Sequence, residues 1–217
     1  MYTLFLFQFR SEFRRKSIFL SLVLYLIALV FINYLSIGIQ HRSLSPGIWS
    51  ALFWMAMLST LIHVVAKSFM GDKQGTMTYL YSLASPGQII LSRIFYNFFL
   101  CAGIAFTGYV FFAFWLNNPI EDTPLFILTL LLASFGFSST LSILSAIASK
   151  TNNGNVIMAV LSFPILIGIL LMSIKITKNC IDGLEWEASA TPLMMLVGIN
   201  LLASAFTYLL FPYIWRS

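Results

Sequence analysis

Charged residues are scarce in this chain of 217 amino acids. Asp, Glu, Lys and Arg make up 9% of the sequence, whereas an average soluble domain carries about 25%. Hydrophobic residues make up 59%, which is more than a soluble core of this size needs. The shortage of charge excludes an ordinary water-soluble domain. It predicts an all-α integral membrane protein with a single domain over residues 1–217.

The residue types and motifs that enzymes use are also scarce. The sequence has 2 histidines and 2 cysteines. It contains no CxxC pair, no HExxH zinc motif, no P-loop and no complete nucleophile elbow. We therefore expect neither catalysis nor a metal centre nor a nucleotide site in this chain. Cys101 lies within an apolar run and is expected to be buried, whereas Cys180 is expected to lie in a loop.

Long apolar runs account for most of the sequence. Each run is close to the ~20 residues that a helix needs to cross a bilayer. The six predicted spans are at about 18–38, 48–68, 92–116, 124–148, 155–175 and 192–214. Residues 1–17 place apolar side chains on one helical stripe and a basic cluster at its end, which predicts an interfacial helix on anionic lipid.

The basic residues are distributed unevenly between the two sides of these spans. Three of the 12 Lys and Arg residues fall on one side: Arg42, Lys175 and Lys178. Five of the 7 acids fall on that same side: Glu121, Asp122, Asp182, Glu185 and Glu187. Because Lys and Arg mark cytoplasmic loops, we expect both termini in the cytoplasm. A basic patch with interleaved aromatic residues is absent outside the spans, so nucleic acid is not an expected partner.

The segment 69–91 is the longest predicted connection on the cytoplasmic side. Four apolar residues in it have a 3-4-3 spacing that predicts one helical face: Met77, Leu80, Tyr81 and Ala84. The sequence SPG at 85–87 is predicted to end this helix, because the residue before a proline is disfavoured in the α region. Such a cytoplasmic coupling helix is suited to transmit a movement of a soluble partner protein to the membrane helices. A helix that only rests on the lipid headgroups is the alternative.

Three further features are predicted from the pattern. The short polar connection 149–155 contains Lys150, Asn152 and Asn153 and is a second candidate cytoplasmic contact. Residues 176–191 are predicted to form the longest loop on the opposite side, with Trp186 as an aromatic anchor. His63 lies inside the second span, where an ionisable group is a candidate functional residue. The simpler alternative is that His63 hydrogen-bonds to a neighbouring helix.

Parts of the sequence match motifs of a known family. SPGIW at 45–49 opens the second predicted span, and VLSFPI at 160–165 lies in the fifth. A third set of residues follows the second span: Phe69, Asp72, Gly75, Thr76, Met77, Leu80 and Pro86. These motifs resemble those of the haem exporter protein B (CcmB) family, the permease subunit of the ABC system for cytochrome c maturation. Three positions where the family usually has acids are Lys67, Gln74 and Thr78 here.

The resemblance implies an ABC-2/type V exporter-like permease of six transmembrane helices. It also implies a homodimer, a separate cytoplasmic ABC ATPase that binds the ATP, further cytochrome c maturation subunits, and a haem chaperone. The set from Phe69 to Pro86 would contact the ATPase, and haem is the candidate substrate. By analogy, the first and fifth spans are expected at the dimer seam. An exporter permease for a glycan, lipid or drug and a non-transporting scaffold remain alternatives.

Overall fold

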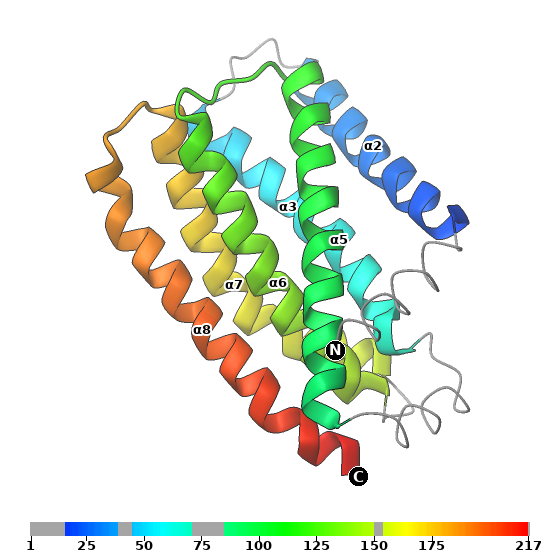
Figure 1. The fold of residues 1–217 in the computed structure, drawn as a ribbon. Coiled ribbons are helices and arrows are strands. Elements are labelled where there is room, and N and C mark those ends of the chain that lie inside the picture. Colours follow the sequence, from blue (N-terminus) through cyan, green and yellow to red (C-terminus); the bar gives the residue numbers. More distant parts are fainter. Residues whose placement is uncertain (1–15, 39–44, 71–84, 150–153, 217) are drawn as a thin grey trace.

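The computed structural model describes residues 16–38, 45–70, 85–149 and 154–216. Within these ranges all regular structure is helical, and six helices are present (Figure 1). Their bounds are Lys16–Gly38 for α2, Pro46–Met70 for α3, Pro86–Trp115 for α5, Thr123–Ser149 for α6, Gly154–Ile181 for α7 and Trp186–Arg216 for α8.

Helices that follow one another in the sequence run in opposite directions along one bundle, so α3, α6 and α8 are parallel to one another (Figure 1). We call the end where α5 and α7 begin, and where α3, α6 and α8 end, the proximal end. The opposite end is the distal end. Both predicted cytoplasmic contacts are flanked by helix ends at the proximal end, because one connects α3 to α5 and the other connects α6 to α7.

The sequence at each helix start explains where the helix begins. Pro86 opens α5, and Ser85 before it is extended, with φ −69° and ψ 149°. The Ser85 carbonyl accepts hydrogen bonds from the N–H groups of Gln88 (3.0 Å) and Ile89 (3.2 Å). Proline suits this position because its missing N–H would have no helical partner. The predicted third span therefore starts too late at residue 92, since the SPG sequence opens a helix that already covers 86–91 of the predicted coupling segment.

The predicted distal loop 176–191 is mostly helical. α7 continues to Ile181 and α8 begins at Trp186, so only four positions, 182–185, connect them. Asn179 accounts for the tight connection, because its carbonyl accepts the Leu184 N–H (3.1 Å) and its Nδ2 donates to Ser189 Oγ (3.0 Å). Gly183 supplies the positive φ of 61° that the turn requires. The predicted fifth and sixth spans are thus parts of longer helices.

The same correction applies to Cys180. It lies in the last turn of α7 with none of its surface exposed, and not in a loop. Its carbonyl accepts the N–H groups of Glu121 (3.1 Å) and Asp122 (3.2 Å), which ties the connection before α6 to the end of α7. The buried position of the thiol removes the structural basis for a disulfide between two copies through this residue.

Helix α6 is the centre of the bundle. It packs against α3, α5, α7 and α8. In its most apolar stretch 72% of the residues are buried, compared with 17% in the corresponding stretch of α8. Small residues allow this close packing. Many of them are buried in α6: Ala133, Ser134, Gly136, Ser138, Ser139, Ser142, Ser145 and Ala146. Helix α2 lies at one edge, where it packs against α3 and α5.

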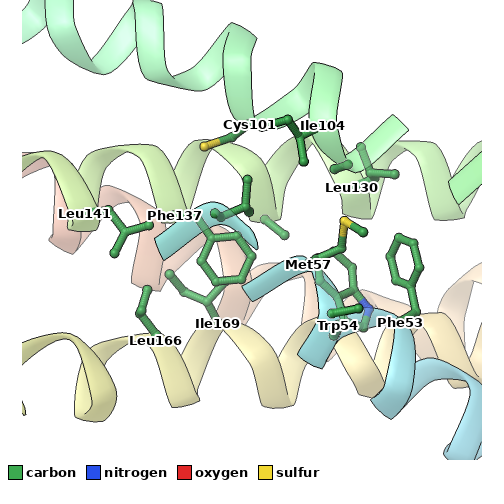
Figure 2. Packing of buried hydrophobic residues seen from close by; sticks show 14 of the residues in the cluster. Phe53, Trp54, Met57, Cys101, Ile104, Leu130, Phe137, Leu141, Leu166 and Ile169 are labelled. Atoms are coloured by element: carbon green, nitrogen blue, oxygen red, sulfur yellow. The ribbon is translucent and has the colours of Figure 1, made fainter. Parts of the chain in front are cut away.

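Aromatic rings fill the interior towards the distal end. Trp49 in α3 stacks on Phe53, with ring centroids 5.5 Å apart, and meets Phe112 of α5 edge-on at 5.8 Å. One turn further along, Trp54 Nε1 donates a 2.9 Å hydrogen bond to Thr177 Oγ1 of α7. Figure 2 shows Trp54 and Met57 of α3 close to Phe137 of α6 and Ile169 of α7 in the core. These contacts join α3 to the rest of the bundle.

Four helices in the described part of the chain are long and apolar enough to cross a membrane: Pro86–Trp115, Thr123–Ser149, Pro164–Ile181 and Trp186–Tyr213. α2 contains a shorter apolar stretch, Val23–Ser36. The outward faces are also apolar, with exposed residues such as Phe114, Met194 and Leu201. Length, composition and surface together identify a multi-pass helical membrane protein.

Candidate functional site

The predicted ATPase-contact residues divide between described and undescribed parts of the chain. Phe69 lies in the last turn of α3, and Pro86 is the first residue of α5. The other predicted contact residues lie outside the described residues: Asp72, Gly75, Thr76, Met77, Leu80, Lys150, Asn152 and Asn153. The structure therefore shows the helix ends that hold both predicted contacts.

The start of α5 is packed against α8. A Cβ built on Gly87 would lie 3.1 Å from the ring of Tyr208, so the α5 backbone approaches this side chain closely. A glycine is suited to this position because it leaves room for the tyrosine ring. Movement of the first turn of α5 towards α8 is therefore opposed by the ring of Tyr208.

Polar side chains connect α5 to α6 in the buried interior. Asn97 Nδ2 donates to Ser142 Oγ (2.8 Å), and Ser138 Oγ donates to the Ile94 carbonyl (2.6 Å). All four residues are buried. The polar groups of these side chains are hydrogen-bonded, because an unpaired polar group in an apolar interior would lower the stability of the fold. The proximal part of α5 is thus joined to the central helix by side chains and by backbone.

Similar bonds connect α8 to α6. Asn200 Nδ2 donates to the Leu132 carbonyl (2.8 Å), and Thr207 Oγ1 donates to the Ser139 carbonyl (3.2 Å). α5, α6 and α8 therefore form one hydrogen-bonded group around α6. Neither Asn97 nor Asn200 was predicted as a functional residue. An amide side chain inside an apolar run was the signal that could have identified them.

Arg93 is buried near the start of α5. It is one of the nine Lys and Arg residues that the charge distribution assigns to the cytoplasmic side, and only 5% of its surface is exposed. It lies one helical turn before Asn97 and on the same face of α5. Arg93 therefore places a buried charged side chain on the face of α5 that also carries Asn97.

His63 lies in the proximal half of α3, at the contact with α2. Its Nδ1 is 2.9 Å from the carbonyl oxygen of Ser59 in the same helix. Its ring centroid is 5.2 Å from that of Tyr25 in α2, with the planes tilted by 37°. The expected hydrogen bond to a neighbouring helix is therefore replaced by a bond within α3 and a ring contact across to α2. The imidazole remains exposed on the outside of the bundle.

The distal end carries acidic residues in the two connections. Asp122 caps α6, because its Oδ1 accepts the N–H of Leu125 (3.1 Å). Glu121, Asp182, Glu185 and Glu187 are exposed there. Trp186, the predicted aromatic anchor, opens α8 and is 52% exposed. Among the described residues, no group of three or more His, Cys, Asp or Glu side chains is arranged to hold a metal ion.

The comparisons with known proteins agree with this architecture. The sequence model of the CcmB protein family matches residues 1–213, which is nearly the whole chain. No curated protein and no solved structure matches it. The family match and the apolar helical bundle together show that this chain belongs to the CcmB protein family, the permease component of haem exporters in cytochrome c biogenesis.

Proposed function

We propose that this chain is the six-span permease subunit of an ABC haem exporter and that a separate cytoplasmic ATPase drives it from the proximal end. ATP hydrolysis in that partner is linked to haem movement, or to release of a haem-loaded chaperone, on the distal side. The subunit works as a homodimer in a bacterial inner membrane, together with other cytochrome c maturation subunits. Both termini lie in the cytoplasm.

The hydrogen-bonded contact between α5 and α6 supports this coupling. The segment between α3 and α5 leads directly into Pro86, and the α5 residues Ile94 and Asn97 are bonded to α6. Because α6 packs against four of the other helices, a displacement at the start of α5 reaches most of the bundle. A soluble ATPase that pushes on this segment therefore has a mechanical connection to the membrane-embedded part.

The distribution of charge supports the orientation. The sequence assigns most of the Lys and Arg residues to the side of the proximal helix ends, whereas acids dominate the described distal connections. Basic residues are retained on the cytoplasmic side of membrane proteins. The proximal end is therefore the side that meets a cytoplasmic ATPase.

Replacing Thr76 with Trp tests the proposed contact. The variant is purified in mild detergent from its native membrane, and co-purifying proteins are identified by mass spectrometry. We expect a large loss of a bound ABC ATPase and of mature cytochrome c, with normal amounts of the variant in the membrane. Thr191→Trp is the matched control, because Thr191 is exposed near the distal end of α8. If Thr76→Trp co-purifies as much ATPase as Thr191→Trp does, the ATPase does not bind at the segment that contains Thr76.

The identity of the co-purified proteins tests the substrate. An ATPase together with haem-handling membrane subunits supports the haem exporter. An ATPase together with glycan or drug-resistance proteins would replace haem by another exported substrate. Full cytochrome c maturation with a hydrolysis-deficient ATPase would instead identify a non-transporting scaffold.

A further inference from the structure

His63 presents one ring nitrogen to the outside of the bundle. Its Nδ1 is 2.9 Å from the Ser59 carbonyl oxygen. A carbonyl oxygen only accepts hydrogen bonds, so Nδ1 carries the proton and donates it. In the neutral imidazole the lone pair is then on Nε2. The backbone of α3 therefore selects the tautomer with Nε2 free to accept a proton or bind a metal.

This arrangement is the one that metal-binding histidines use. Such histidines almost always donate their other ring N–H to a carbonyl, a carboxylate or water, which fixes the tautomer and the ring orientation and raises the basicity of the ligating nitrogen. In His63 the carbonyl of Ser59 supplies this acceptor within the same helix. The imidazole is thus prepared for coordination without any change in its surroundings.

The surroundings of the ring fit a large, flat and apolar ligand. Tyr25 of α2 places its ring 5.2 Å from the imidazole at a tilt of 37°. Two turns away on the same stripe of α3, Met55 is 62% exposed. The Ser59 hydroxyl between them is occupied by a 2.8 Å bond to the Met55 carbonyl. On the stripe formed by Met55, Ser59 and His63, Nε2 is therefore the nitrogen base that is available to a ligand, and the ring of Tyr25 lies beside it.

Haem fits the chemistry of this surface. It is a flat apolar ring with an iron that accepts imidazole. Met55 offers an apolar side chain, Tyr25 an aromatic ring and His63 an imidazole.

We propose that His63 is an axial ligand for haem iron through Nε2, at a membrane-facing site between α2 and α3 with Tyr25 beside the porphyrin. This inference rests on the proposed function, because it takes haem as the substrate. It adds the place where haem meets this subunit and the atom that binds the iron. Haem would reach this site laterally from the membrane, and not through the interior of the bundle, which is packed.

Titration of the full-length protein with ferric haem tests the site. The protein is reconstituted in lipid nanodiscs, and the Soret absorption is measured against empty nanodiscs. We expect a saturable shift of the Soret band in the wild type and a haem affinity at least about tenfold lower in His63→Ala. Loss of the hydrogen-bond partner of a metal-binding histidine already lowers metal affinity by about tenfold or more, and loss of the histidine itself is expected to lower it at least as much. His41→Ala removes the other histidine of the chain and is expected to bind haem like the wild type.

Two further measurements separate iron binding from a structural effect. His63→Gln keeps a side-chain amide that donates to the Ser59 carbonyl but has no imidazole for the iron, so it is expected to fold and to lose binding. Metal-free protoporphyrin is expected to bind weakly and equally to all variants. Wild-type affinity in His63→Gln, a loss of affinity in His41→Ala, or equally tight binding of the metal-free ring to the wild type would each overturn the proposal.

Failure of this site is distinguishable from failure of the proposed function. Mature cytochrome c and the co-purified ATPase are measured in cells that carry each variant. If His63→Gln binds haem normally while the wild type still supports cytochrome c maturation with its ATPase, only the haem site is wrong. If the wild type neither holds an ATPase nor supports maturation, the proposed function itself fails.

Discussion

Asn97 and Ser142 join two membrane helices in the buried interior of the protein, with Asn97 Nδ2 2.8 Å from Ser142 Oγ. The first residue lies on α5, which begins where the predicted ATPase-contact segment ends. The second lies on α6, the helix in contact with most of the bundle. This pair is a defined place where a force on the cytoplasmic segment would enter the centre of the structure.

The contribution of this pair is measurable by a double-mutant cycle. Asn97→Ala and Ser142→Ala are made singly and together, and the free energy of unfolding is measured in mixed micelles. We expect an interaction energy of about 0.6 kcal/mol, and at most about 1.7 kcal/mol, as for side-chain hydrogen bonds between membrane helices. Strict additivity of the two substitutions would show that the pair contributes no coupling between α5 and α6.

Trp54 and Trp49 allow a matched comparison of two buried indoles. Trp54 Nε1 donates to Thr177 Oγ1, whereas Trp49 Nε1 has no hydrogen-bond partner among the described residues. We expect Trp54→Phe to lower the free energy of unfolding by about 0.5–1.5 kcal/mol more than Trp49→Phe does, because only the first substitution removes a hydrogen bond. Denaturant unfolding followed by circular dichroism measures the difference. An equal or larger effect of Trp49→Phe would contradict it.

Gly136 is a point of close approach between α6 and its neighbours. A Cβ at this position would meet Asn200 Oδ1 and would lie 2.9 Å from Ile169 Cδ1. We expect Gly136→Ala to destabilise the protein by about 1–3 kcal/mol, since overpacked interiors displace side chains. Gly103→Ala on α5 is the control, because its Cβ would meet nothing within 4 Å. Thermal unfolding of both variants measures the loss of stability. A smaller loss of stability in Gly136→Ala than in Gly103→Ala would contradict the close approach of α6 to its neighbours.

The two cysteines are expected to resist modification in the folded protein. Cys101 and Cys180 are both completely buried. A maleimide reagent should therefore label neither thiol until the protein is unfolded in SDS. Thr191→Cys adds a thiol at an exposed position on α8 and should react at once, which confirms that the reagent has access. Fast labelling of Cys180 in the native protein would show that the end of α7 opens to water.

Much of the architecture was predictable because the membrane restricts the choices. A chain with so little charge and such long apolar runs must form helices, since lipid offers no partner for backbone N–H and C=O groups. The position of Pro46 indicates where the second span begins, and α3 begins there in the structure, whereas Pro86 was predicted only to end a helix and begins α5. The motif at 45–49 and the residues from Phe69 to Pro86 also pointed to the correct family, which the match over residues 1–213 confirms.

The helix lengths were less predictable, because an apolar run shows the part of a helix in lipid and not its whole extent. α7 and α8 continue through the predicted loop 176–191 up to a short turn at Gly183. Polar residues such as Lys178 and Asn179 are compatible with helix outside the apolar region. The hydrogen bond from Asn179 to Ser189 joins two residues of this single predicted loop, which belong to α7 and α8 in the structure.

The sequence by itself therefore determined the class of the protein, its helical content and its family. The tertiary structure decided which side chains meet: that Asn97 pairs with Ser142, that Arg93 is buried, and that Cys180 is enclosed. Membrane helices are apolar on nearly every face, so the periodicity that identifies the buried side of a soluble helix is weak. Their packing is chosen by small residues and by a few polar contacts between distant segments, and those contacts exist only once the helices have assembled.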